Sequence, residues 1–465
     1  MSSPLVIRAA ARREAELAWV CEVIFGRWLG LAYRIEPNAQ GTPEVEVVAA
    51  RGSVVWPDTF LANADAHWLQ LESLPAVPLP SWPIPEEVRD RVGQSSAAQF
   101  FGDGRFEEGT ARIRLPIDIT GSIFFMLSRY EEAVAGAATD RHGRSPGSAS
   151  LAHRAGWALR PLVDEWVELL WWAIQRVAPG LRRRARAPKV WVSCDVDAPY
   201  SPGAKGIGWA LRQTASDLVN HRSPAQAGRT LLNAAASRVG VTRFDPFDTF
   251  DWMMDVNERA GHRVTFFFIN VDRPLKIDGC YELGEPRVSR LLERLVARGH
   301  DIGLHGSYAS VDSADRLAGE LEGLRSAVRR AGGSQDAFGS RQHYLRWRPR
   351  ETARMLDGLP LAYDSTLAFA DVAGFRCGTC HDFPLFELVG GRALALVERP
   401  LVLMEATVIS RAYLGLGFGE AARDLMMGLR ESCRRFGGEF SLLWHNSNLV
   451  HPAARELYAE LLQPW

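Results

Sequence analysis

The second half of the chain alternates short apolar runs with longer amphipathic stretches. From about residue 188 onward, runs rich in β-branched and aromatic residues predict strands at 190–194, 264–269, 301–304, 338–341, 361–363, 400–404 and 440–444. Amphipathic patterns between most of these runs predict helices, for example at 288–298, 314–331 and 421–436. This alternation is typical of a parallel α/β architecture. Seven strands favour a distorted (β/α) barrel, in which functional side chains gather at the carboxyl ends of the strands.

The first part of the chain has a different pattern and is predicted to form an additional α/β domain. We expect one domain at 1–185 and the barrel at 186–465. The long connection at 201–245 is expected to be a helical insertion that caps the barrel, with its helical pattern at 207–236. In the N-terminal region, the sequence predicts helices at 12–30, 123–134 and 159–177 and short β segments at about 111–116. A proline-rich stretch lies at 74–85. An arginine-rich run at 181–186 marks the boundary, and a solvated linker is favoured there over a phosphate-binding site.

Composition and charge restrict the class of protein. The chain has 465 residues, 47% of them hydrophobic and 23% charged, which is typical of a globular protein with more than one domain. A net charge of −1 argues against a nucleic-acid partner. The most apolar stretches, 17–32 and 166–177, are interrupted by charged residues and are not expected to insert into a membrane. Six cysteines and an N-terminus without signal-peptide features lead us to expect a cytoplasmic protein with reduced thiols.

Two carboxylates stand at the end of the first predicted strand of the barrel. Asp195 and Asp197 are two residues apart, so a strand places them on the same face, roughly 7 Å apart. Two anions this close resist ionising together unless a cation or a proton lies between them. The pair could be a solvated strand edge or part of a site.

Polar side chains also follow most of the other predicted strands. They are His305 after the third strand, Arg341 and His343 after the fourth, Asp364 after the fifth and His445 after the seventh. Independent surface residues would be scattered along the strands. The shared placement at strand ends therefore favours a single site.

Several segments resemble the polysaccharide deacetylase family, also called the NodB-homology or carbohydrate esterase 4 family. The resemblance spans about residues 188–450 and is carried by Val264-Thr-Phe-Phe-Phe268, Gly299-His-Asp-Ile-Gly-Leu-His305, Arg341-Gln-His-Tyr344, Tyr363-Asp-Ser-Thr-Leu367 and Phe375-Arg-Cys-Gly-Thr-Cys380. One branch of the family is also similar in the N-terminal region, at Asp118-Ile-Thr-Gly-Ser-Ile-Phe-Phe125 and Ser128-Arg-Tyr-Glu-Glu132. The order of the motifs along the chain makes the resemblance specific.

The resemblance implies a metal-dependent deacetylase that acts on an N-acetylated sugar or a glycan precursor. It implies Asp195 as the general base, His445 as the acid, and Asp197 and His305 as ligands of a divalent metal. We expect zinc, with cobalt or nickel as alternatives. Arg341 is expected to hold Asp195 in its ionised form. Tyr344, Asp364 and Trp444 are expected to contact the substrate.

One position departs from the family pattern. The second metal-binding histidine of the family is replaced by Ala309, which cannot bind a metal. A catalytic zinc ion usually has three protein ligands, and His343 is our expected substitute because it shares a strand face with Arg341. Two alternatives stay open: a catalytically inactive carbohydrate-binding or scaffold protein, and an amide hydrolase that acts on a formamide or ureide.

A second motif, Cys377-Gly-Thr-Cys380-His381, matches the pattern for covalent haem attachment. Haem attachment requires export, which the N-terminus does not suggest. A redox pair or a zinc site at the two cysteines is an alternative, but the sequence offers no further ligands for zinc.

Overall fold

The computed structural model describes most of the chain. The residues that it does not describe are 1–3, 11, 39–40, 202–210, 213, 216–223, 225–226, 229–230, 233–243, 272–274 and 280. The expected helical insertion at 201–245 therefore lies mainly outside the described residues.

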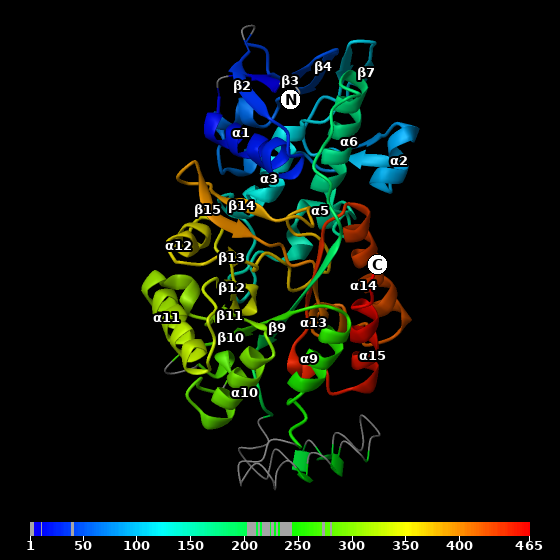
Figure 1. Cartoon of the computed structure of the whole chain (residues 1–465). Helices are drawn as coiled ribbons and strands as arrows, with labels where there is room; N and C mark the ends of the chain where they lie inside the picture. The colour runs from blue at the N-terminus through cyan, green and yellow to red at the C-terminus, as the bar shows by residue number, and fades with distance from the viewer. Residues whose placement is uncertain are drawn as a thin grey trace.

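The N-terminal region forms its own sheet, which is drawn in blue and cyan in Figure 1. The strand order is β2-β1-β3-β4-β8-β7, with a separate two-stranded ladder of β5 and β6. The strands are β1 Leu5–Ala9, β2 Tyr33–Pro37, β3 Glu44–Ala49, β4 Gly52–Pro57, β5 Ser81–Pro83, β6 Ser96–Ala98, β7 Glu107–Glu108 and β8 Arg112–Arg114. The helices are α1 Glu14–Cys21, the π-helix η1 Glu22–Trp28, α2 Glu86–Val92, α3 Ile119–Leu127, α4 Tyr130–Ala133, α5 Leu151–Arg154 and α6 Leu162–Val177.

Two of the helices expected in this region are interrupted. The expected helix at 12–30 is an α-helix that continues as the π-helix η1. The expected helix at 123–134 starts earlier, because the Asp118 side chain accepts a hydrogen bond from the Gly121 N–H and caps the first turn of α3. It is then divided into α3 and α4 at Arg129, whose φ of 55° is left-handed.

The C-terminal region forms a nine-stranded sheet in the order β14-β15-β13-β12-β11-β10-β9-β17-β16. Eight neighbouring strands are parallel, and β14 pairs antiparallel with β15 at one edge. The strands are β9 Lys189–Val196, β10 Val264–Phe268, β11 Asp301–Gly306, β12 Gly339–Gln342, β13 Tyr363–Asp364, β14 Phe383–Glu387, β15 Arg392–Glu398, β16 Leu403–Met404 and β17 Glu439–Leu443. All seven expected strands are present, and β14 and β15 are additional. Among the described strands, no ladder joins β16 to β14 or β15, so the sheet is curled and open rather than a closed barrel of seven strands.

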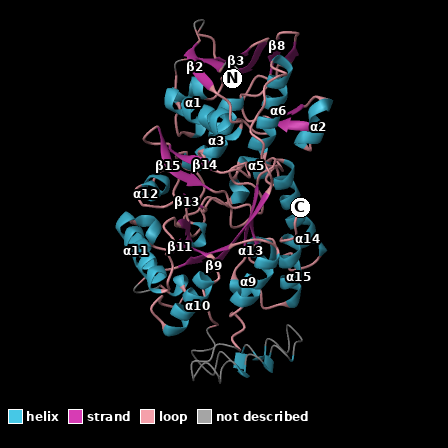
Figure 2. Ribbon diagram, viewed as in Figure 1, coloured by secondary structure: helices cyan, strands magenta, loops and turns pink. Residues whose placement is uncertain are grey.

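Helices cover the outside of this sheet (Figure 2). They are α9 Phe250–Arg259, α10 Pro286–Ala297, α11 Ala314–Arg330, α12 Thr352–Asp357, α13 Glu405–Ile409, α14 Glu420–Arg435 and α15 Pro452–Leu461. Each long helix is amphipathic; in α10, for example, Val288, Leu291, Leu292 and Leu295 are buried. The expected helices at 288–298, 314–331 and 421–436 correspond to α10, α11 and α14. None of the described helices is long and apolar enough to cross a bilayer.

The N-terminal region packs on the β14–β15 edge of the larger sheet (Figure 1). The indole N–H of Trp19 donates to the Pro384 carbonyl, and that of Trp28 donates to the Asp382 carbonyl. Glu132 of α4 accepts two hydrogen bonds from the guanidinium of Arg376, and both side chains are buried. The two regions are therefore joined by buried polar contacts, and the sheet edge is covered rather than exposed.

Candidate metal centre

The carboxylates of Asp195 and Asp197 lie at the carboxyl end of β9, an interior strand between β10 and β17. Asp195 is 3% exposed, whereas the Asp197 side chain is 38% exposed. The first carboxylate is thus enclosed by protein, and the second faces the opening above the strand ends.

Arg341 on β12 reaches across the interior of the curled sheet to Asp195. Its guanidinium is fully buried and donates to Asp195 Oδ1 at 2.8 Å. It also donates to Ser193 Oγ and to the carbonyl and hydroxyl of Ser365. A buried cation with so many fixed partners holds the Asp195 carboxylate in one position.

Two imidazoles converge on Asp197. Asp197 Oδ1 lies 3.2 Å from His305 Nε2 and 3.6 Å from His343 Nε2. One ligand atom from each of the three residues lies within 4.8 Å of the others. His305 ends β11, and His343 directly follows β12, so neighbouring strand ends bring the three side chains together.

The far nitrogen of each imidazole is held by another group. His305 Nδ1 lies 2.9 Å from the Arg341 carbonyl oxygen, and His343 Nδ1 lies 2.9 Å from Asp278 Oδ1. In the neutral tautomers that donate these hydrogen bonds, both Nε2 atoms carry a lone pair directed at the centre.

These residues have the chemistry of a divalent metal site. Asp197 Oδ1 is buried and has no hydrogen-bond partner in the described part of the chain. One carboxylate and two imidazoles are a common donor set for catalytic zinc. Asp197, His305 and His343 therefore fit a divalent cation, and His343 lies where it can act as the third ligand that Ala309 cannot provide.

The charges around the centre shift its pKa values. Burial alone would raise the pKa of Asp197, but His343, His305 and His445 hold it well below its ordinary value. Burial alone would lower the pKa of His343, but Asp197 and Asp278 raise it to about 9. The centre thus strongly favours positive charge beside the Asp197 carboxylate.

His445, which follows β17, lies on the other side of Asp197. Its Nε2 is 3.6 Å from Asp197 Oδ2, and its Nδ1 is 2.7 Å from Glu405 Oε1. Glu405 is fully buried and also accepts from the His445 backbone N–H and from the Asn448 side chain. Burial alone would lower the pKa of His445, but Glu405, Asp197 and Asp195 raise it to about 10. These carboxylates therefore favour the protonated form of His445.

Two of the three residues expected to contact substrate are instead buried. Asp364 is fully buried, and its carboxylate accepts hydrogen bonds from the Ser340 hydroxyl and the Thr366 N–H. Trp444 is fully buried against Tyr458. Both side chains are enclosed by protein, and their contact with a substrate stays a prediction. Tyr344 is partly exposed, and its ring packs against His343 at a centroid distance of 4.8 Å, so it borders the metal centre.

Asp278 and Glu405 were not expected from the sequence. Glu405 follows the sixth predicted strand directly, so the strand-end rule that selected the other residues could have found it. Asp278 lies in a short 3₁₀ turn between β10 and α10, and no strand end or spacing marks it.

Comparisons with known proteins match parts of the chain. Residues 5–179 match the model of a family of unknown function, DUF7033. No curated protein matches the chain. Among solved structures, a Mycobacterium smegmatis protein described as a polysaccharide deacetylase aligns with a TM-score of 0.38 and 19% identity, over 60% of this chain and 85% of that chain. Puue allantoinase aligns with a TM-score of 0.36 and 12% identity, over 59% of this chain and 83% of that chain. The functional assignment therefore depends on the site itself.

Proposed function

We propose that the chain is a metal-dependent hydrolase that removes the N-acetyl group of an amino sugar in a polysaccharide or its precursor. The observation that supports this function is the arrangement around Asp197. A donor set for a divalent cation lies between an enclosed carboxylate, Asp195, and an imidazolium, His445. Amide hydrolysis needs these three elements, because the carbonyl must be polarised, water must lose a proton, and the leaving nitrogen must gain one.

Asp197, His305 and His343 hold the cation. When bound, a divalent cation supplies Lewis-acid polarisation of the amide carbonyl and lowers the pKa of water. The hydrogen bonds from Nδ1 of the two histidines keep their Nε2 lone pairs directed at the centre.

Asp195 acts as the general base, and Arg341 is its positioning residue. The 2.8 Å contact with the guanidinium fixes one carboxylate oxygen. The other, Oδ2, lies 3.6 Å from His305 Nε2 and faces the metal centre. Asp195 Oδ2 can therefore take a proton from water beside the scissile carbonyl.

His445 acts as the general acid, and Glu405 is its positioning residue. The pKa of about 10 keeps the imidazole protonated at neutral pH. Its Nε2 lies 3.6 Å from Asp197 Oδ2, beside the metal centre, so it can give its proton to the departing amine.

The amino-sugar substrate is supported by the motifs that resemble the polysaccharide deacetylases. The experiment that tests it measures acetate release from N-acetylglucosamine oligomers by the zinc-, cobalt- or nickel-loaded chain, with an Asp195→Asn variant as control. Acetate release that the variant loses is the expected result. Formate release from formamides without acetate release would instead support the non-sugar amidase, and release of neither acid would support the inactive scaffold.

Glu405→Gln is expected to move the alkaline limb of the pH profile of kcat/KM to lower pH by about one to two units. Glu405 raises the pKa of His445, so neutralising it lowers that pKa, and the acid is lost at a lower pH. Glu431→Gln, at an exposed position on α14, is the matched control and should leave the profile unchanged. An unmoved alkaline limb in Glu405→Gln would remove His445 as the acid.

A further inference from the structure

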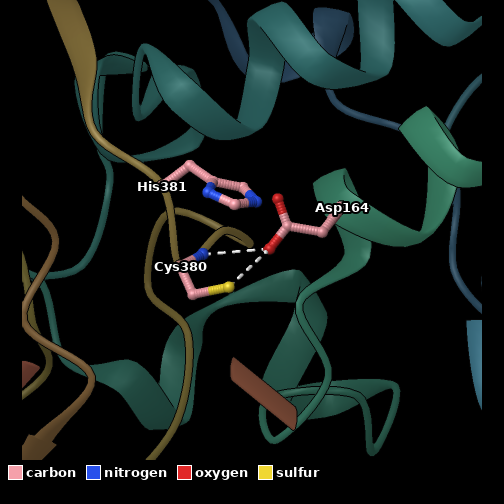
Figure 3. Close-up of side chains that lie close together, drawn as sticks. All are labelled: Asp164, Cys380 and His381. Atoms are coloured by element: carbon pink, nitrogen blue, oxygen red, sulfur yellow. Dashed lines mark hydrogen bonds between the residues drawn. The ribbon is translucent and has the colours of Figure 1, made fainter. Parts of the chain in front are cut away.

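A second group of metal-binding side chains lies where the N-terminal region meets the larger sheet. It consists of Asp164 in the first turn of α6 and Cys380 and His381 in the loop before β14 (Figure 3). One ligand atom from each lies within 4.8 Å of the others. Cys380 Sγ is 3.1 Å from Asp164 Oδ2, a spacing at which two atoms can share one metal ion.

A fourth donor comes from α14. The Cys433 thiol is fully buried and interacts with the Cys380 thiol, although it is not among the three residues whose ligand atoms all lie within 4.8 Å of one another. Gly438 allows the chain to pass close to this group, since a Cβ there would lie 2.1 Å from Cys380 Sγ. The group itself supplies one sulfur, one imidazole and one carboxylate, and Cys433 would add a second sulfur and complete a four-coordinate donor set that suits zinc.

The cysteine motif is therefore divided between two environments. Cys377 is not part of the group, so the structure does not form a site from the Cys377–Cys380 pair. Both thiols are buried, at 0% and 2% exposure, which leaves no open face for covalent haem attachment. The ligands that the sequence could not supply for Cys380 come from α6 and α14.

Solvent can reach the group from two adjoining cavities. Asp164 and His381 line a cavity of about 650 Å³, and Cys380 and His381 line another of about 740 Å³. Both cavities are also lined by the arginine-rich run; Arg186, for example, lines both. A cation in this basic setting needs anionic ligands, and Asp164 with two thiolates supplies three negative charges.

The group is separate from the candidate metal centre at Asp197. The Glu439 N–H donates to the Cys380 carbonyl, and Glu439 pairs with Lys189 at the start of β9. Asp197 follows the opposite end of β9, eight residues after Lys189, which corresponds to roughly 25 Å of strand.

We propose that Asp164, Cys380, His381 and Cys433 bind a zinc-class divalent ion that joins α6, the loop before β14 and α14. Binding converts the two thiols to thiolates and releases their two protons to solvent, so the net charge of ion and ligands stays balanced. The Cys380 thiol that now donates to Asp164 gives up this hydrogen bond when its sulfur binds the ion. The ion would connect the N-terminal region to the sheet at a point remote from the proposed chemistry.

Cobalt(II) tests this site separately from the Asp197 centre, because only a thiolate ligand gives a sulfur-to-cobalt charge-transfer band in the near ultraviolet. Metal-free full-length chain titrated with cobalt(II) is expected to show this band. Asp197→Ala should keep the band even if it abolishes hydrolase activity. The test of the cysteine site is therefore independent of the test of the proposed hydrolase centre. Cys377→Ser is the matched control for a buried cysteine and should also keep it.

Cys380→Ser is expected to abolish the band, and Cys433→Ser to weaken it and lower the affinity by about tenfold or more. If Cys380→Ser does not fold, the spectra of Cys433→Ser and of the wild type test whether the cysteines bind the ion. Cobalt binding to the wild-type chain without a charge-transfer band overturns the proposal, and so does a band that survives unchanged in both variants.

Discussion

Arg341→Ala is expected to lower the free energy of unfolding of the metal-free chain by about 3–5 kcal/mol. The guanidinium is fully buried, holds Asp195 at 2.8 Å and donates to Ser193 and Ser365. Its removal leaves a buried carboxylate without its counter-ion and three further acceptors without their donor. Urea unfolding followed by circular dichroism measures the effect.

A double variant separates the charge effect from the loss of packing. Adding Asp195→Asn to Arg341→Ala removes the unpaired charge and should recover part of the lost stability, while activity stays absent. Arg330→Ala, at an exposed position near the end of α11, is the surface control and should change stability by less than about 0.5 kcal/mol. A loss in Arg341→Ala as small as in this control would show that the buried pair does not hold the sheet interior together.

Asp195→Asn is expected to reduce kcat by about 10²–10⁴-fold without loss of bound metal. The amide keeps the size of the carboxylate but cannot take a proton, and Asp195 lies beside the donor set rather than in it. Steady-state acetate release and metal analysis on the same preparation measure the two effects together.

Asp301→Asn, at the amino end of β11, is the matched control because its side chain is 45% exposed and remote from the carboxyl ends of the strands. It should retain activity. A kcat for Asp195→Asn within tenfold of the wild-type value would remove Asp195 as the base, and loss of metal in that variant would make it a ligand instead.

The hydrophobic pattern predicted most of the larger sheet, because parallel strands buried on both faces read as continuous apolar runs. The missed strands β14 and β15 form an antiparallel hairpin. Pro384 interrupts the pattern of β14, and a proline within a run argues against a strand. The turn signal Gly390-Gly391 between them was present in the sequence, and the alternating burial of β15 is typical of a strand covered on one face.

Most of the residues that meet at the candidate centre could be predicted from their position at the carboxyl ends of strands. That position does not show in which direction a side chain points. Trp444 and His445 are adjacent, so an extended chain directs them to opposite sides. Both could not face the site, and the structure buries Trp444. Asp364 also points away from the strand ends, because its carboxylate accepts hydrogen bonds from Ser340 and Thr366 in the interior. Asp278 could not be found at all, since only the folded loop brings it to His343.

Ala309 stands where the resemblance to the deacetylases leads us to expect a histidine ligand, so the proposed metal centre depends on His343. It reaches Asp197 from β12 rather than from the loop after β11, and Asp278 orients it. A centre with this ligand would keep three protein donors, as catalytic zinc requires. Without it, Asp197 and His305 alone would hold an ion weakly.

The role of His343 as the third metal ligand is tested most directly by zinc analysis of the purified, zinc-replete chain. The quantity to compare is the number of zinc ions bound per chain in the wild type and in each variant. His343→Ala is expected to bind one zinc ion per chain fewer than the wild type, as is Asp197→Ala. His67→Ala, at an exposed histidine, should match the wild type. The difference is independent of any zinc at Cys380, because that site is unchanged in all of these variants. Equal zinc content in His343→Ala and the wild type would contradict the metal centre described here.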